Sequence, residues 1–489
     1  MTLAFESRAA RQALANLPQL QAQESLDPPA LARVYVPALH VKALSLDNSI
    51  VVGMRGAGKS WWTAVLASDP HREFVSAQLP SSSLGRVRAC VGFGLDDTET
   101  SFPRPDTLTE LLGQGRAPID IWQTVVLRHA LATLKHPLPF PERRWKEAVG
   151  WFLDHREEAN DLLTRCDEQL AREGRVLLVL FDAFDRLARV WTEIRELARG
   201  ALEAGLRLRS RRSIRVKFFL RPDLDEDGEL WRFPDSSKFQ PTKVSLAWGS
   251  SDLYGLVIMH LSNDGDFGPT FRKLVAGELK VQWRETKGVY LPPQQLTTDD
   301  KQKLLLEALA DRTMGAGPKR GYTFSWIPLH LSDAKGRVSP RSFLLAFQKA
   351  AEHTEQHRPH HHLALHYDSI QRGVIKASEV RVAEIGEDYP WVRPLLESLR
   401  GVVVPLTVEE VKTRWSAECV DEMLRMGKEK LPPRRYADDP FRAGTPEALV
   451  DDLVELGVVY RTGDGRLNMP DIFRVGYGIR RKGGVKPPR

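Results

Sequence analysis

The alternation of apolar and polar residues predicts an α/β fold for the first half of the chain. An apolar run occupies residues 50–52, and a longer continuous one lies within residues 175–181, as is typical of a parallel strand buried on both faces. Residues 214–220 are interpreted as another strand of the sheet. Helical periodicity predicts helices over residues 120–131, 143–172 and 190–206. We interpret residues 73–77 as a further strand, and residues 85–117, rich in Gly, Asp, Thr and Pro, as a long surface insertion.

Beyond residue 245 the pattern becomes helical. Helices are predicted to begin near Trp248 and at Ser339-Pro340, where serine precedes proline at the helix entrance. After two short helices that follow Thr407, a helix is predicted from Thr445-Pro446 to a stop at Gly457, and a β-hairpin follows it. Three helices followed by a hairpin predict a winged helix.

A glycine-rich turn joins the first predicted strand to a predicted helix. Residues Gly53–Ser60 fit the G-x-x-x-x-G-K-[ST] pattern of a P-loop. Glycine allows backbone N–H groups to curl round a phosphate without Cβ clashes, and the helix N-terminus faces the same anion. We expect Lys59 to reach the β- and γ-phosphates and Ser60 to ligate Mg²⁺. The predicted nucleotide-binding residues are Gly53, Arg55, Gly56, Ala57, Gly58, Lys59, Ser60 and Trp61.

The strand over residues 175–181 ends in an acid, Asp182. This position lies at the carboxyl edge of a parallel sheet, where ligands of open α/β folds bind. We expect Asp182 to act as a Walker B acid that holds Mg²⁺ directly or through water, together with Ser60; the alternative role is a helix N-cap. Asp185 either orients the attacking water or forms a surface salt bridge.

Two arginines are candidates for contact with a γ-phosphate. Arg221 ends the strand over residues 214–220, where a cation can sense the γ-phosphate or stabilise transition-state charge. The alternative is an ion pair with Asp223 or Asp225. Arg341 lies in the first turn of the helix that begins at Ser339-Pro340, where the helix dipole disfavours a cation. An anionic partner such as a γ-phosphate would explain why an arginine stands in this turn. The alternative is that Arg341 has no such partner.

The distribution of charge says more than the net charge of +6. Two clusters stand out: Arg207, Arg209, Arg211, Arg212 and Arg215 in one segment, and Arg480, Arg481, Lys482, Lys486 and Arg489 at the end of the chain. Such clusters either follow the phosphates of double-stranded DNA or are solvated faces and tails.

Cysteine usage and hydropathy point to the cytoplasm. The 3 cysteines are widely spaced, which favours reduced thiols over a disulfide framework or a zinc motif. No apolar run approaches the roughly 20 residues needed to span a bilayer, and the N-terminus lacks a signal-peptide pattern. We therefore expect no membrane contact.

Taken in order, these motifs resemble those of bacterial P-loop ATPases of the STAND and AAA+ initiator-like (origin-recognition type) branch. Gly53–Ser60 resemble Walker A, Leu180–Asp185 resemble Walker B, and Ser339–Arg341 resemble the sensor-2 motif of a lid. Arg221 looks like the arginine that follows the fourth strand, and residues 453–474 are similar to the winged-helix ending.

The resemblance implies an order of domains for a chain of 489 residues, which is too long for one ordinary core. We expect a P-loop NTPase core with a parallel sheet, followed by a helical lid and a winged helix. The expected boundaries are 1–34 for an N-terminal helical extension, 35–245 for the core, 246–400 for the lid and 401–489 for the winged helix with its basic tail.

One position departs from the pattern of many AAA+ enzymes, which place a Glu directly after the Walker B Asp. Here that residue is Ala183. Either Asp185 polarises the water, or hydrolysis is slow and the protein works as a nucleotide-timed switch.

The resemblance implies a regulatory ATPase that binds ATP and Mg²⁺. ATP is favoured over GTP because no guanine-reading N-K-x-D motif stands at a plausible place after Asp182. Nucleotide state would control engagement of double-stranded DNA or a partner protein, with a homo-oligomer as an open possibility. Such proteins often act in multi-gene systems against phages or mobile DNA. Two alternatives stay open: a nucleotide-binding scaffold or sensor with little turnover, and a winged-helix DNA-binding regulator.

Overall fold

The computed structural model describes residues 3–18, 26–79, 82–96, 100–427, 432–438 and 442–481. Contacts between Cα atoms divide the chain into two compact units. One, here called the sheet unit, is Ala22–Ala247; the other, here called the helical unit, combines Met1–Gln21 with Trp248–Arg489. Each is described by itself.

The sheet unit is organised around a five-stranded sheet in the order β2-β3-β4-β1-β5, in which every neighbouring pair is parallel. The strands are β1 (Ile50–Val52), β2 (Val87–Phe93), β3 (Val176–Phe181), β4 (Ile214–Leu220) and β5 (Lys243–Ser245). All six residues of β3 are buried, as its continuous apolar run predicts. The predicted α/β fold with a parallel sheet is confirmed.

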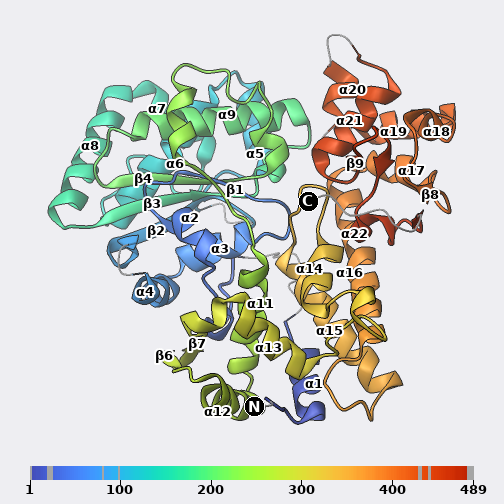
Figure 1. Ribbon diagram of the computed structural model, residues 1–489. Helices are drawn as coiled ribbons and strands as arrows, with labels where there is room; N and C mark the ends of the chain where they lie inside the picture. The colour runs from blue at the N-terminus through green and yellow to red at the C-terminus, as the bar shows by residue number, and fades with distance from the viewer. Residues whose placement is uncertain are drawn as a thin grey trace. The chain divides into compact units, whose positions relative to one another are not determined.

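Helices cover both faces of this sheet (Figure 1). On one face lie α5 (Pro105–Gly113), α6 (Pro118–Thr133), α7 (Trp145–Asp154), α8 (Arg156–Arg172) and α9 (Trp191–Leu208). On the other lie α2 (Val41–Leu44), α3 (Lys59–Ala67) and α4 (Asp69–Gln78). The core under α6 is aromatic: the Trp122 ring meets Phe93 and Phe181 edge to face. The Trp122 indole N–H also donates to the carbonyl of Leu197, at 2.8 Å, which ties α6 to α9.

Two sequence predictions in this unit are wrong. Residues 73–77 belong to helix α4, not to a strand; the helix begins at Asp69 with a proline at its start, a signal that a five-residue window leaves out. Residues 85–117 are not a surface insertion, because they contain strand β2 and helix α5. The glycine at 92 marks close packing in the sheet, since a Cβ there would lie 2.6 Å from Val179.

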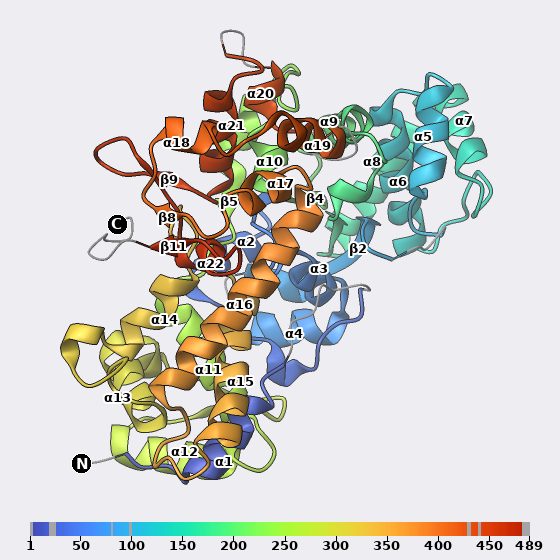
Figure 2. The ribbon, with the colours of Figure 1, turned by 90° about the vertical axis from the view of Figure 1, so that its right-hand side faces the viewer.

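The helical unit is built around two long helices, α15 (Pro340–His357) and α16 (Tyr367–Asp388), with α1 (Ser7–Ala15) against α15 (Figure 2). The guanidinium of Arg11, only 2% exposed, donates to the carbonyls of Pro359 and Ala364 and pairs with Glu355. The N-terminal helix therefore fixes the turn between the two long helices. Around them lie α11 (Ser250–Ser262), α12 (Gly268–Leu279), β6 (Arg284–Thr286), β7 (Val289–Leu291), α13 (Asp299–Leu309), α14 (Thr323–Leu331) and α17 (Val392–Glu397).

The C-terminal part of the helical unit contains the predicted helices and hairpin. Its elements are β8 (Val403–Val404), α18 (Val408–Lys412), α19 (Ala417–Gly427), α20 (Arg434–Asp438), α21 (Pro446–Leu456), β9 (Tyr460–Arg461), β10 (Leu467–Asn468), α22 (Asp471–Arg474) and β11 (Arg480–Arg481). Helix α21 is capped as expected: Thr445 Oγ1 accepts from the Ala448 N–H, and Gly457 has a left-handed φ of 80°.

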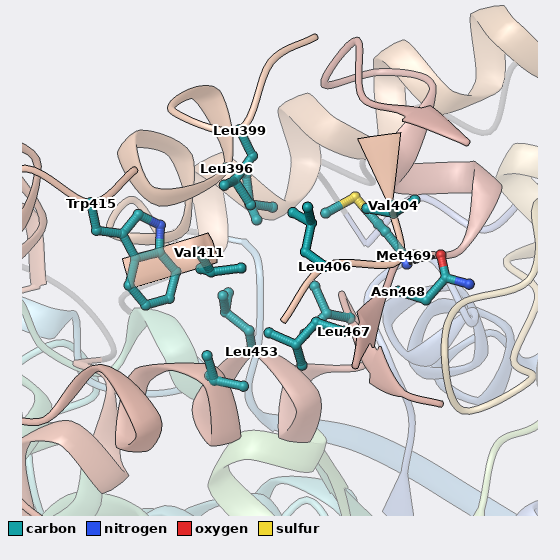
Figure 3. Close-up of a pocket in the computed structure, with 12 residues that line it drawn as sticks. Leu396, Leu399, Val404, Leu406, Val411, Trp415, Leu453, Leu467, Asn468 and Met469 are labelled. Atoms are coloured by element: carbon teal, nitrogen blue, oxygen red, sulfur yellow. Dashed lines mark hydrogen bonds between the residues drawn. The ribbon is translucent and has the colours of Figure 1, made fainter. Parts of the chain in front are cut away.

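The hydrophobic core of this C-terminal part encloses a cavity of about 20 Å³ (Figure 3). Its lining is almost entirely apolar, with Leu406, Leu453 and Trp415 among the side chains that face it. A space this small and this apolar is a packing defect and not a ligand site.

Candidate functional site

The P-loop lies between β1 and α3, where the sequence predicts it. The Gly53 N–H donates to the carbonyl of Leu220 at 3.0 Å, which continues the sheet by one residue. Gly56 and Gly58 have φ values of 77° and 102°, which side chains rarely adopt, and Gly58 is the N-cap of α3. Gly53 has a different reason to be glycine: a Cβ there would lie 3.1 Å from the Cβ of Leu246. Two of the three glycines are therefore required by backbone conformation, and Gly53 is required by close packing.

Lys59 begins α3 and reaches back over the loop. Its Nζ donates to the carbonyl of Gly53 at 2.7 Å and to that of Met54 at 3.1 Å. The ammonium group thus lies over the same turn whose backbone would surround a phosphate. A phosphate oxygen bound there would compete with these two carbonyls for the same proton donors.

The other predicted nucleotide-binding residues extend this loop and helix. Ala57 is buried, and Arg55 and Trp61 are partly buried. The Trp61 ring meets Trp62 edge to face at 4.7 Å, on the next position of α3. Trp62 is fully buried, so the first turn of α3 is anchored in the core.

Asp182 follows β3 at the carboxyl edge of the sheet. Its N–H donates to the carbonyl of Phe93 at 2.9 Å, and its side chain is 1% exposed. Neither carboxylate oxygen makes a hydrogen bond of normal geometry. Burial raises the pKa of Asp182, and the nearby Ser60 hydroxyl and Lys59 ammonium lower it in part. The predicted Walker A and Walker B residues therefore lie next to each other.

The sheet order explains this arrangement. Strand β4 lies between β1 and β3, so Asp182 stands two strands, roughly 10 Å, from the end of β1. Ser60 bridges that gap because it lies in the first turn of α3, beyond the loop. A buried carboxylate beside a hydroxyl group, with no hydrogen bond of normal geometry to the described residues, is a set of hard oxygen ligands that fits Mg²⁺. The residues present are therefore compatible with the predicted metal.

Arg221 and Asp185 lie at the same edge and contact each other. Arg221 Nη1 is 3.7 Å from Asp185 Oδ2, and its Nε donates to Asp223 Oδ1 at 3.1 Å. Arg221 is 11% exposed and Asp185 is 42% exposed. The ion-pair alternatives considered for both residues are present in the structure, whereas Asp225 pairs with Lys243 instead. Contact with a phosphate or a water stays a prediction for both.

Ala183 separates Asp182 from the short 3₁₀ helix Phe184–Arg186, which carries Asp185. Its φ is 55°, in the left-handed region. The chain therefore turns sharply straight after the buried acid, and the position that holds Glu in many AAA+ enzymes carries only a methyl group.

Arg341 lies in the helical unit, near the start of α15, and is held by an ion-pair network. Its Nη1 donates to Glu384 on α16, and Arg381 Nη1 donates to the same carboxylate at 3.0 Å. The Arg341 Nε is buried and has no hydrogen-bond partner in the part of the chain that the structure describes. Its anionic partner in the structure is thus a carboxylate 43 residues away in sequence.

Two buried titratable residues near the P-loop, His40 and Lys217, are not among the residues predicted from sequence. His40 accepts from the Trp62 indole N–H through Nδ1, so its proton resides on Nε2, which donates to the Ala247 carbonyl at 3.0 Å. Burial lowers the pKa of His40 to about 4. Lys217 of β4 donates to the carbonyls of Ala43 and Ser45, and burial lowers its pKa to about 7.

A sequence signal existed for one of these residues. Lys217 interrupts the apolar run of β4, and a cation in a buried strand requires polar partners. The partners come from the segment before β1, which sequence periodicity alone does not bring next to β4.

Several arginines of the two basic clusters are engaged within the protein. Arg209 donates to the Lys238 carbonyl, Arg211 to Thr164 Oγ1 and Arg215 to the Ile214 carbonyl. In the C-terminal cluster, Arg481 lies 3.5 Å from Asp471. Lys482, Lys486 and Arg489 lie outside the described residues. Contact of either cluster with DNA stays a prediction.

No helix in the described part of the chain has both the length and the apolar character that a membrane span requires. No protein-family model matches the sequence, and no curated protein matches it.

Among solved structures, the chain is similar to the Aeropyrum pernix ORC2 protein in its ADPNP–ADP complexes, with 14% identity over 91% of this chain and 90% of that chain and a TM-score of 0.37. The ADP form of the same protein matches with 15% identity over 94% and 93% of the two chains and a TM-score of 0.28. Both TM-scores are too low for the likeness to support an inference about function.

Proposed function

We propose that this protein is a regulatory ATPase that binds ATP and Mg²⁺ at the P-loop. One observation carries the proposal: Asp182 is buried beside Ser60 and Lys59, at the end of the strand two places from the P-loop strand, and makes no side-chain hydrogen bond of normal geometry with any described residue. A structural carboxylate would be expected to have a partner, because an unsatisfied buried charge destabilises the fold. A metal ion held by Asp182 and Ser60 would supply that partner.

Each residue of the site has a distinct task in this proposal. The N–H groups of the loop and of the first turn of α3 bind the phosphates, and Lys59 exchanges the Gly53 and Met54 carbonyls for phosphate oxygens. Ser60 and Asp182 would hold the metal, which would supply neutralisation of phosphate charge. Arg221 is available at the edge of the site for a γ-phosphate once it leaves Asp185.

Turnover is expected to be slow. Ala183 places no acid next to Asp182, and Asp185 forms an ion pair with Arg221. The lack of a free acid beside Asp182 therefore favours a second candidate, a nucleotide-binding switch or scaffold. Such a protein would act through whether nucleotide is bound and not through the rate of hydrolysis. The two candidates differ in whether phosphate release depends on Asp182.

We further infer that the helical unit reads the nucleotide state. In this proposal Arg341 acts as a lid arginine, and the elements from α18 to β10 form a winged helix that engages double-stranded DNA or a partner protein. The family resemblance of the motifs supports this inference. The same resemblance leads us to propose that the protein acts in the cytoplasm in defence against phages or mobile DNA. Protection against phage in cells that carry the gene with its neighbours, lost in the Lys59→Ala variant, would test that last step.

The binding proposal is tested by Lys59→Ala, with Lys42→Ala as a matched control from an exposed position of the same unit. We expect Lys59→Ala to abolish ATP binding in titration calorimetry and Lys42→Ala to leave it unchanged. Phosphate release, measured with and without duplex DNA, then separates the ATPase from the scaffold. Tight ATP binding by Lys59→Ala would refute the site.

A further inference from the structure

The helical unit contains a second cavity, of about 620 Å³, between α14 and the C-terminal hairpin. Its walls come from residues 319–333 on one side and from residues 460, 469–471 and 481 on the other. The volume lies within the roughly 300–1,000 Å³ of small-molecule sites. Nothing in the proposed ATPase mechanism uses it.

The two walls are fixed relative to each other. His330 of α14 and Asp471 of α22 line opposite walls and touch where the walls meet, because His330 Nε2 lies 3.3 Å from Asp471 Oδ2. Helix α22 is in turn held on α16, because Ser378 Oγ donates to the Ile472 carbonyl at 2.7 Å. On the other side, the Ala334 N–H donates to the carbonyl of Gly457 at 2.9 Å. The cavity is therefore formed before any ligand binds.

Three cationic side chains line the cavity: Lys319, Arg320 and Arg481. Among the described residues, the side chains of Lys319 and Arg320 form neither an ion pair nor a hydrogen bond. Arg481 lies 3.5 Å from Asp471. The nearer partner of Asp471 is Arg474, at 2.6 Å, so that carboxylate does not neutralise Arg481 in full.

The one other acid in the lining is already neutralised. Asp333 pairs with Arg337 at 2.7 Å and accepts the N–H groups of Lys335 and Arg337. The lining therefore carries an excess of positive charge, which a multiply charged anion would offset.

An aromatic and apolar surface lies in the same cavity. The Trp326 ring stacks on His330 at 3.8 Å, with an interplanar angle of 20°. Leu329, which also lines the cavity, is 42% exposed, and Tyr460 lies in the opposite wall. A planar ring packed here would cover apolar surface that is otherwise in contact with water.

We propose that this cavity binds a nucleoside phosphate, with the phosphates at Lys319, Arg320 and Arg481 and the base against Trp326. Neither the cations nor the aromatic surface alone would select this ligand class, but a phosphate and a planar base on one molecule match both. The proposal does not rest on the P-loop function, because the cavity lies entirely within the helical unit.

The probe is the 5′-phosphorylated dinucleotide pApA, titrated calorimetrically into the full-length protein, with inorganic phosphate as a second probe. We expect Lys319→Ala/Arg320→Ala to weaken pApA binding by about tenfold or more, because two charged donors are lost. Both side chains are exposed and have no partner among the described residues, so the fold should be retained. Trp326→Leu should weaken pApA binding but leave inorganic phosphate unaffected.

Two controls make the result specific. Lys273→Ala/Arg414→Ala removes the same charge from exposed positions outside the cavity and should leave pApA binding unchanged. Lys59→Ala should also leave it unchanged. Absence of saturable binding, an equal loss in Lys273→Ala/Arg414→Ala, or loss in Lys59→Ala would overturn the proposal. An unchanged affinity in Trp326→Leu would overturn the nucleoside part and leave a simple anion site.

Discussion

Asp182→Asn should stabilise the protein without nucleotide and at the same time remove its response to Mg²⁺. Burial raises the pKa of Asp182, and within the described part of the chain neither of its carboxylate oxygens makes a hydrogen bond of normal geometry. An acid with a raised folded-state pKa favours the fold when it is protonated, so stability is gained as the pH falls towards that pKa. At neutral pH the charged form therefore destabilises the native state. Asparagine imitates the protonated form.

The size of the effect follows from what the carboxylate lacks. A buried polar group without a partner costs about 1–3 kcal/mol, and a charged group costs more than a neutral one. Asparagine keeps the polar atoms and removes the charge, and Lys59 and Ser60 already offset part of that charge. We therefore expect a gain of about 1–2 kcal/mol in the free energy of unfolding. For a unit of this size, that corresponds to a rise in melting temperature of roughly 2–8 °C.

The assay is thermal unfolding of the full-length protein in EDTA, in Mg²⁺ and in Mg²⁺ with ATP. Wild type should gain stability with Mg²⁺ and ATP, whereas Asp182→Asn should start from a higher melting temperature and gain little. Asp185→Asn is the matched control: Asp185 is itself exposed and its 3.7 Å ion pair with Arg221 contributes about 0–1 kcal/mol, so the melting temperature should hardly rise. A lower melting temperature for Asp182→Asn in EDTA, with an intact response to Mg²⁺ and ATP, would refute the reasoning.

Three further predictions concern other parts of the fold. Glu384→Gln should free Arg341 and raise ATP affinity several-fold in calorimetry. It should also lower the melting temperature, because a broken buried ion pair costs about 3–5 kcal/mol. Unchanged ATP affinity would argue against the lid role of Arg341. Burial lowers the pKa of His40 to about 4 in the fold, so between pH 7 and pH 5 the unfolded state binds a proton that the folded state does not. Lowering the pH from 7 to 5 should therefore reduce the free energy of unfolding by about 2 kcal/mol. In urea titrations His40→Asn should lose less stability over the same pH range. Val450→Ile should fill the 20 Å³ cavity and stabilise by about 0.5–1 kcal/mol, whereas Val392→Ile in filled core should destabilise.

The parts of the site that sequence could predict are local in the chain. The P-loop needs only eight consecutive residues after a strand, and each of its glycines has a conformational or packing reason that the pattern already contains. Asp182 was predictable for a similar reason, because a continuous apolar run ends directly before it. Their contact follows from the parallel sheet, which brings the carboxyl ends of strands to one edge.

The parts that sequence could not predict depend on partners far apart in the chain. The carboxylate that holds Arg341 lies on the next long helix, and the carbonyls that hold Lys217 come from the segment before β1. Strand β2 was missed because it lies at the edge of the sheet, where exposed residues such as Arg88 are tolerated and the apolar run is broken.

The geometry at the sheet edge bears on how fast the proposed ATPase can turn over. Arg221 Nη1 lies 3.7 Å from Asp185 Oδ2 while its Nε donates to Asp223, so a γ-phosphate that attracts the Nη1 end of Arg221 would release Asp185 in the same step. The residue proposed to bind the phosphate and the residue proposed to orient the water are thus coupled by one ion pair. Because Ala183 supplies no second acid, water activation would have to follow this exchange. A slow, nucleotide-timed switch is therefore the behaviour that this arrangement favours.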